Sequence, residues 1–219
     1  MIQIEQTADG SNTLFVPELN EHYHSVKGAL TESEHIFINM GLKHSAVSAP
    51  HVLEIGFGTG LNAFLTQLEA ERSKRSIRFT TLERYPLAES VVRSLNYPEH
   101  IAPEHAASYY ALHQAEWNIP VAISPHFTLC KIETDFTTYH FEDYYDVIYF
   151  DAFAPEKQPE MWSQSLFETL FRQTNRGGIL TTYCAKGVVR RMLQSAGFTV
   201  ERLPGPPGGK REILRAVKA

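Results

Sequence analysis

A chain of 219 residues, of which 43% are hydrophobic, is long enough for one domain with a large core. The formal net charge of −5 excludes a uniformly basic nucleic-acid coat, although a local basic patch is compatible with it. No leader peptide and no apolar run of roughly 18 residues are visible, and Cys130 and Cys184 lie in apolar strand-like runs that favour reduced thiols. We therefore expect a soluble cytoplasmic protein without a membrane partner.

The first part of the chain predicts a hairpin followed by a helix. Alternating apolar side chains on both sides of the turn signal at residues 9–12 predict a β-hairpin over residues 1–16. Thr31 and Glu34 have the spacing of a capping box, and the apolar residues after them predict a helix of about three turns.

Two histidines, His22 and His24, flank Tyr23 between the predicted hairpin and helix. Histidine is a common zinc ligand, but no partner ligands occur at zinc spacing. We therefore predict no metal site and expect these side chains to line a pocket.

A glycine-rich loop after the strand predicted at residues 51–55 is the main functional signal. It contains Gly56, Gly58 and Gly60, and a helix over residues 61–73 follows. Glycine at alternate positions of a strand-to-helix turn lets the backbone approach a ligand closely. A dinucleotide fingerprint has its glycines at the first, third and sixth positions. Here they occupy the first, third and fifth positions, and Glu54 lies two residues ahead of the first, a pattern that resembles the loops that bind S-adenosylmethionine.

Three further polar residues are candidates for contact with the same cofactor. Glu83 ends the next predicted strand, where a carboxylate can accept both hydroxyls of a ribose. Asn62 opens the helix after the glycine loop. Asp135 follows the third strand and can accept the amino protons of adenine, but the alternative is a cap or turn aspartate, because Asp favours both.

The remaining pattern predicts an α/β fold. Strand, loop and helix alternate from residue 51 onward, which implies parallel strands, and residues 96–124 indicate an insertion before the third strand. The predicted strands are 51–55, 77–83, 127–132, 145–150, 179–184, 198–203 and 212–217, and the predicted helices are 61–73, 86–95, 105–114, 161–173 and 186–195.

Asp151 is the candidate catalytic residue. It directly follows the fourth predicted strand, at the edge of a parallel sheet where ligands bind in this fold. The alternative is that its carboxylate caps the following turn.

Four motifs together resemble the methyltransferase component of the MnmC/MnmD tRNA-modifying enzymes. They are Gly56-Phe57-Gly58-Thr59-Gly60-Leu61-Asn62, Glu83-Arg84-Tyr85-Pro86, Asp151-Ala152-Phe153-Ala154-Pro155-Glu156-Lys157-Gln158-Pro159-Glu160-Met161-Trp162 and Gly209-Lys210-Arg211-Glu212. The string D-x-F-A-P-x-K-x-P-x-M-W is the most specific of them. Similarity at residues 28–33 and 188–193 extends the resemblance over nearly the whole chain.

This resemblance implies a class I S-adenosylmethionine-dependent methyltransferase. The fold would be a Rossmann-like, mostly parallel seven-stranded sheet over residues 47–219, with a hairpin-and-helix extension over residues 1–46. The implied reaction methylates the amine of 5-aminomethyl-(2-thio)uridine at the tRNA wobble position and gives the 5-methylaminomethyl form. Some relatives are fused to a flavin-dependent oxidase, but no second glycine fingerprint follows here. We expect no flavin and no obligate protein partner.

The implied reaction assigns roles to further residues. An alkyl amine is mostly protonated at neutral pH, so Asp151 is expected to orient the ammonium and to take or relay its proton. Tyr23, Phe153 or Trp162 are expected to stack on the uracil. The candidates for contact with the RNA backbone are Lys186, Arg190, Arg191, Lys210 and Arg211. For each of these cations the alternative is an ordinary solvated face.

Two rival functions remain open at this point. An aminopropyltransferase resembling spermidine synthase would share the glycine loop, the ribose carboxylate and an aspartate after the fourth strand. A non-catalytic nucleotide- or RNA-binding module is the second rival. The D-x-F-A-P-x-K string favours the tRNA methyltransferase over both.

Overall fold

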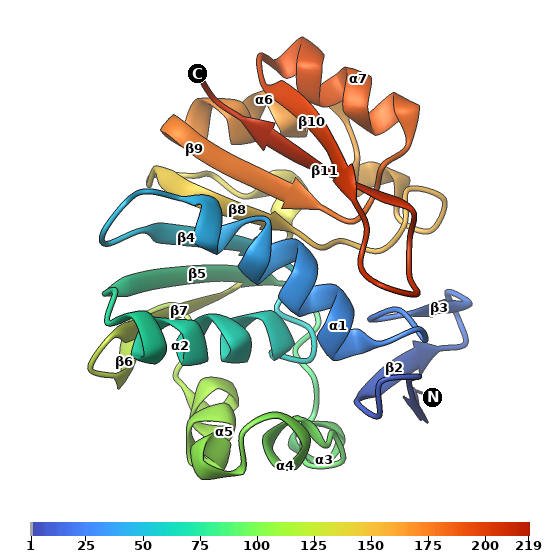
Figure 1. Cartoon of the computed structure of the whole chain (residues 1–219), viewed down its shortest axis with the longest axis vertical. Coiled ribbons are helices and arrows are strands. Elements are labelled where there is room, and N and C mark those ends of the chain that lie inside the picture. The colour runs from blue at the N-terminus through green and yellow to red at the C-terminus, as the bar shows by residue number, and fades with distance from the viewer. Residues whose placement is uncertain (1) are drawn as a thin grey trace.

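A computed structural model describes residues 2–219 and contains an eight-stranded sheet with helices on both faces (Figure 1). The strand order is β10-β11-β9-β8-β4-β5-β7-β6. From β9 to β7 the strands are parallel, whereas β11 and β6 run antiparallel to their neighbours. The strands are β4 (His51–Ile55), β5 (Ile77–Glu83), β6 (Pro120–Ser124), β7 (Phe127–Glu133), β8 (Tyr145–Phe150), β9 (Thr174–Thr182), β10 (Thr199–Pro204) and β11 (Glu212–Val217).

Alternating side chains of the central strands fill two separate cores. In β8, Val147 and Tyr149 belong to one core, and Ile148 and Phe150 belong to the other. The first core includes Phe64, and the opposite core receives residues of the last two helices. Burial on both faces is what a doubly covered parallel sheet requires. The helices with ordinary α geometry are α1 (Ala29–Ser33), α2 (Leu61–Ser73), α3 (Glu89–Val92), α4 (Tyr97–Ile101), α5 (Ala106–Gln114), α6 (Gln164–Gln173) and α7 (Gly187–Ala196).

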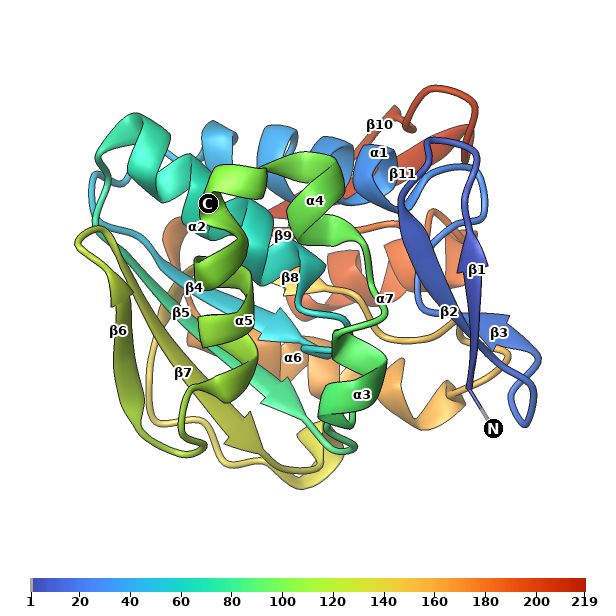
Figure 2. The ribbon, with the colours of Figure 1, turned by 90° about the horizontal axis from the view of Figure 1, so that it is seen from below.

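The N-terminal hairpin is confirmed and is part of a three-stranded antiparallel sheet. Its strands are β1 (Gln3–Gln6), β2 (Asn12–Val16) and β3 (Glu21–His22). Figures 1 and 2 place this small sheet beyond the ends toward which β4 and β8 point. The carboxyl ends of the parallel strands therefore face the N-terminal segment.

The predicted capping box is wrong. Gly28 is the N-cap of α1, and Thr31 instead donates through its hydroxyl and its backbone N–H to Asp9 Oδ2, each at 2.8 Å. The helix continues as a π-helical segment, η1 (Glu34–Asn39). Asp9 thereby fixes the hairpin turn against the start of α1.

Several element boundaries differ from the prediction. The helix expected at 86–95 is reduced to α3, and α6 begins three residues late because Ser163 is its N-cap, accepting from Leu166 N. The strand β6 adds an eighth strand to the seven expected. Short 3-10 turns complete the chain: η2 (Leu42–His44), η3 (Pro103–His105), η4 (Phe136–Thr138) and η5 (Pro159–Met161). Among residues 2–219, no helix combines the length and apolar character needed to cross a bilayer.

Candidate active site

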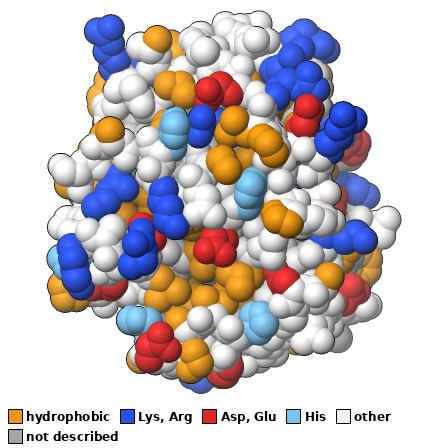
Figure 3. Space-filling model, viewed as in Figure 1, with side chains coloured by type: hydrophobic (Ala, Val, Ile, Leu, Met, Phe, Trp, Pro, Cys, Tyr) orange, Lys and Arg blue, Asp and Glu red, His pale blue; other side chains and the backbone are white. Residues whose placement is uncertain are grey.

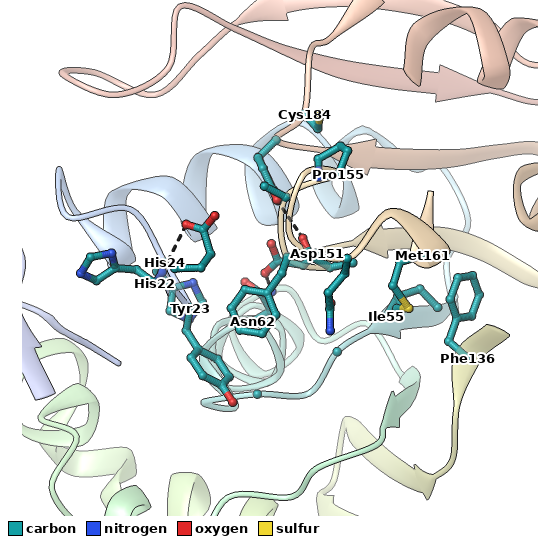
Figure 4. Close-up of a pocket in the computed structure, with 18 of the residues that line it drawn as sticks. His22, Tyr23, His24, Ile55, Asn62, Phe136, Asp151, Pro155, Met161 and Cys184 are labelled. Atoms are coloured by element: carbon teal, nitrogen blue, oxygen red, sulfur yellow. Dashed lines mark hydrogen bonds between the residues drawn. The ribbon is translucent and has the colours of Figure 1, made fainter. Parts of the chain in front are cut away.

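A cavity of about 850 Å³ opens at the carboxyl ends of the central strands. Its walls come from the N-terminal segment, the glycine loop and the loops after β5, β7 and β8. Residues just before α7 and residues just after β10 complete them. Asp151 lies near the middle of the labelled residues, between Asn62 and Met161 (Figure 4). The topology thus brings the separate motifs of the sequence to one site.

The glycine loop has a backbone that other residues would strain. Gly56, Gly58 and Gly60 have φ values of 92°, 48° and 72°. A Cβ on Gly58 would lie 3.0 Å from the ring of Tyr23, and one on Gly60 would lie 2.6 Å from His113 Nε2. Glycine is therefore required by conformation and by close packing together.

Thr59, inside this loop, is held by side chains from two distant segments. His24 Nε2 lies 2.8 Å from Thr59 Oγ1, while Tyr109 Oη donates to Thr59 O at 2.9 Å and His113 Nε2 lies 3.1 Å from the same oxygen. Burial lowers the pKa of His24 to about 4, so its imidazole is neutral. His24 is thus a support of the loop, a role that the sequence did not indicate.

His22, the other candidate ligand, has a different partner. Its Nε2 lies 3.0 Å from Glu5 Oε2 on the neighbouring hairpin. The described residues 2–219 contain no group of three histidine, cysteine, aspartate or glutamate side chains that could hold a metal ion.

The two glutamates expected near the cofactor lie on either side of the glycine loop. Glu54 is fully buried and lies outside the cavity lining, and Thr81 Oγ1 donates to its Oε2 at 2.7 Å. Burial, with a smaller contribution from Asp151, raises its pKa well above the usual range. Glu83 accepts from the backbone N–H of Gly58 at 2.9 Å and of Tyr85 at 2.7 Å.

Asp151 is partly buried at the end of β8, and Asn62 Nδ2 donates to its Oδ2 at 2.9 Å. Burial, and secondarily the negative charge of Glu32, raises the pKa of Asp151 from 3.8 to about 7, against the opposing effects of Asn62 and Lys210. Such a carboxyl group exchanges a proton near neutral pH. No backbone N–H of residues 2–219 caps onto it, in contrast to the alternative considered from the sequence.

Asp135 lines the cavity but is already engaged. Its Oδ1 accepts from Thr137 N and Oγ1 at 2.9 and 2.7 Å, which makes it the cap of η4, and Arg84 Nη1 donates to Oδ2 at 2.6 Å. The hydrogen bonds of Thr137 lower its pKa. The capping role is therefore present, and the adenine contact stays a prediction.

Two of the three aromatic candidates line the cavity. The rings of Tyr23 and Phe153 meet edge to face with centroids 5.1 Å apart. The third, Trp162, lies outside the cavity lining: the residue is 5% exposed, packs on Phe150 and donates through Nε1 to Phe153 O at 2.8 Å. Trp162 anchors the loop that presents Phe153.

Some of the basic candidates border the cavity and others do not. Lys186, Lys210 and Arg211 border the cavity, whereas Arg190 and Arg191 lie outside its lining. Lys186 forms an ion pair with Glu156. On the face shown in Figure 3, Lys and Arg side chains form several separate groups with acidic side chains among them, rather than one continuous patch.

Glu32 is a cavity residue that the sequence analysis missed. Its side chain is 9% exposed, accepts from Ser25 N at 2.9 Å and pairs with Lys210 Nζ at 2.5 Å. The similarity noted at residues 28–33 is the signal that could have indicated it.

The residues present fit a nucleoside-bearing donor such as S-adenosylmethionine. Gly56 and Gly58 border the cavity with backbone alone, in conformations that a side chain would strain, and Asn62 and Glu83 add polar side chains to the same wall, whereas Glu54 and Gly60 lie outside the cavity lining. Apolar side chains of Ile55, Leu82 and Phe136 add a nonpolar wall to the same cavity.

The chain is similar to known proteins over nearly its whole length. The chain is 29% identical over 229 residues to the tRNA 5-methylaminomethyl-2-thiouridine biosynthesis bifunctional protein MnmC of Cupriavidus metallidurans, covering 97% of this chain and 33% of that protein. It is 32% identical over 216 residues to the protein of the same name from Leptospira interrogans, covering 90% of this chain and 32% of that one. The chain thus spans about a third of the length of these relatives.

Solved structures show the same fold. MNMC2 from Aquifex aeolicus superposes with a TM-score of 0.80 at 23% identity, over 100% of this chain and 70% of that one. Spermidine synthase from Thermotoga maritima superposes with a TM-score of 0.56 at 13% identity, over 100% of this chain and 73% of that one. Both likenesses concern the fold.

Family membership rests on the second half of the chain. The model of a family described as S-adenosyl-L-methionine-dependent methyltransferase matches residues 102–219, more than half of the 219 residues. This segment carries Asp151, Phe153 and the basic loop before β11, which together build one side of the cavity. The protein therefore belongs to the S-adenosyl-L-methionine-dependent methyltransferases.

Proposed function

We propose that the protein transfers the methyl group of S-adenosylmethionine to the amine of 5-aminomethyl-(2-thio)uridine at the tRNA wobble position, giving the 5-methylaminomethyl nucleoside. One observation carries the chemistry. Asp151, a carboxyl group with a pKa raised to about 7, is joined through Asn62 to the helix that follows the glycine loop. An amine beside Asp151 would therefore lie next to the place where the donor is expected.

The tRNA substrate is supported by the relatives. Their names refer to biosynthesis of 5-methylaminomethyl-2-thiouridine in tRNA, and they align over 97% and 90% of this chain. A tRNA substrate would be met in the cytoplasm. We propose no obligate protein partner.

In this proposal the chain's own residues bind the donor, orient the substrate ammonium and remove its proton. When bound, S-adenosylmethionine supplies an electrophilic methyl group on a sulfonium. Gly56, Gly58, Asn62 and Glu83 border the cavity and would hold it, with Asp135 contributing after its pair with Arg84 opens, whereas Glu54 and Gly60 would support this wall from behind. Asp151 would accept a hydrogen bond from the substrate ammonium and take its proton, which frees the nitrogen lone pair for attack. Tyr23 and Phe153, which contact each other edge to face, would together offer an aromatic surface on which the uracil stacks.

The test is methyl transfer in vitro with the purified full chain. The substrate is tRNA from cells that lack this protein, and the products are analysed by nucleoside mass spectrometry. We expect the 5-aminomethyl nucleoside to decrease and the 5-methylaminomethyl nucleoside to increase in equal amount. Aminopropyl transfer from decarboxylated S-adenosylmethionine to putrescine, tested in parallel, would instead assign the fold to polyamine synthesis. Turnover with neither donor would support a binding module.

A further inference from the structure

The ammonium group of Lys210 occupies a small cation site inside the cavity. Glu32 Oε1 lies 2.5 Å from Lys210 Nζ, and the ring centroid of Tyr183 lies 4.2 Å from the same nitrogen. A carboxylate combined with an aromatic face is a favourable environment for an alkylammonium. The site is therefore built for the chemical group that the proposed substrate carries.

Asp151 belongs to the same cluster. It lines the cavity together with Glu32, Tyr183 and Lys210, and Tyr183 Oη donates at 2.8 Å to the backbone oxygen of Ala152, the next residue in the chain. The ring that faces the Lys210 ammonium is thus attached to the strand end that carries the candidate base. An ammonium in this site would be within the influence of both carboxylates.

The two partners of the ion pair differ in how easily they could exchange. The side chain of Lys210 is 41% exposed, whereas that of Glu32 is 9% exposed and also accepts from Ser25 N. Lys210 comes from a loop with glycines at 205, 208 and 209, and a Cβ on Gly208 would meet nothing within 4 Å. The ammonium of Lys210 can therefore be hydrated when it leaves, whereas the nearly buried carboxylate of Glu32 requires another cation in its place.

We propose that Glu32, Tyr183 and Asp151 form the seat for the substrate's primary ammonium, and that Lys210 fills this seat until the substrate displaces it. The inference rests on the proposed function, because it takes the acceptor to be a primary amine. It makes Glu32 and Tyr183 substrate-binding residues and Lys210 an internal competitor. Asp151 then receives the displacing ammonium already oriented.

The first experiment compares Lys210→Met and Glu32→Gln in steady-state methylation of tRNA. Removing the competitor should lower KM for tRNA about threefold, because it eliminates a partly exposed ion pair, and should leave kcat within about twofold. Removing the carboxylate charge should raise KM about tenfold or more. A rise in KM for Lys210→Met would overturn displacement and would make Lys210 a substrate ligand.

Lys43 and Glu69 provide matched controls for these variants. Their side chains are 37% and 7% exposed, they lie 3.7 Å apart, and neither borders the cavity. Lys43→Met and Glu69→Gln should leave KM for tRNA unchanged. Thermal melting of all four variants shows whether a change in KM comes from partial unfolding.

A second experiment needs no turnover and no tRNA. An amine-reactive ester labels the full chain, and mass spectrometry follows the labelling of Lys210 relative to Lys43. Adding n-propylammonium chloride at constant ionic strength should raise the ratio of Lys210 to Lys43 labelling in the native protein, because the added amine consumes the ester for both lysines equally, and Glu32→Gln should show a high ratio without it. Labelling that does not respond to the ammonium refutes the seat even where tRNA is methylated. A response without tRNA methylation retains the seat and rejects the proposed substrate.

Discussion

Two glycine-containing loops contribute side chains or backbone to the cavity, residues 56–60 and residues 205–211 through Lys210 and Arg211, and they differ in what surrounds them. The first is enclosed, with Thr59 held by side chains from both the N-terminal segment and α5. The second closes on itself through backbone bonds, from Gly205 N to Arg211 O and from Gly209 N to Pro206 O, each at 3.0 Å. Lys210 then ties it to Glu32.

The contrast separates what the cavity fixes from what it leaves adjustable. On the glycine-loop side, packing and hydrogen bonds set the backbone before any ligand arrives, which lowers the entropic cost of binding. On the basic-loop side, an exposed side chain is the tie, so this wall can move for a large substrate. Donor binding should therefore depend on shape, and acceptor binding on charge.

The largest effect is expected at Asp151, where the two sides meet. Asp151→Asn keeps the size of the side chain but removes the base, and methyl transfer should fall roughly 10³-fold in kcat, with donor affinity within about threefold. Rapid-quench assays with labelled donor and calorimetric binding measure the two quantities. A loss of donor affinity as large as the loss of kcat would show instead that Asp151 binds the donor and does not act as the base.

Protein stability is the control for Asp151→Asn. Burial raises the pKa of Asp151 from 3.8 to about 7, so ionisation opposes folding, and the stability that the protonated group contributes is lost as pH rises through about 7. Asparagine never ionises. At pH 8 the variant should melt at or above the temperature of the native protein, and this advantage should shrink as pH falls toward 3.8.

The second-largest effect is expected from the same substitution, glycine to alanine, made in each of the two loops. Gly60 and Gly208 have nearly equal φ values of 72° and 70°, but a Cβ would meet His113 Nε2 at 2.6 Å in the first and nothing within 4 Å in the second. Gly60→Ala should therefore weaken donor binding about tenfold or more and lower stability, whereas Gly208→Ala should cost only about 1 kcal/mol of backbone strain. Calorimetry and thermal melting of both variants measure this. Equal losses of donor affinity would remove the distinction between the loops.

Local patterns predicted the donor side better than the acceptor side. The bounds of β4, α2, β5 and β8 agree with the prediction because strand periodicity and glycine punctuation are properties of neighbouring residues. The strand β6 was missed because Pro120 begins it and Pro125 follows it, and its pairing with β7 is a tertiary contact.

His24 was expected to line a pocket and does so, but its contact with Thr59 and the role of Glu32 were missed for the same reason. Glu32 reaches Lys210 only after the N-terminal segment folds over the end of the sheet, and His24 reaches Thr59 in the same way. Neither contact leaves a local pattern. Trp162 carried a family motif, but the motif did not reveal whether the ring faces the cavity or the core.

The third prediction concerns the pH dependence of kcat/KM, which reports ionisations in the free enzyme. The rate should rise with pH through about 7, because Asp151 must lose its proton before it can accept one. Lys210→Met removes a positive charge that favours the Asp151 carboxylate, so the rising limb of its pH profile should move to higher pH. Relative to the plateau at high pH, kcat/KM of this variant at pH 6 should be about threefold lower than that of the native protein. Glu32→Gln should move the limb to lower pH. If kcat/KM rises at the same pH in the native protein and both variants, the charges of Lys210 and Glu32 do not affect the ionisation of Asp151.

The smallest effect is expected for Trp162→Phe, which tests whether the loop carrying Phe153 is fixed from the core. Phenylalanine retains packing on Phe150 but loses the Nε1–H bond to Phe153 O, so stability should fall by about 1 kcal/mol. KM for tRNA should rise no more than about threefold, because Phe153 stays in place but is held less firmly. Denaturant unfolding and steady-state methylation measure the two changes. Unchanged stability with a tenfold rise in KM would show instead that the indole contacts the substrate, and that the wall formed by the loop after β8 rearranges when tRNA binds.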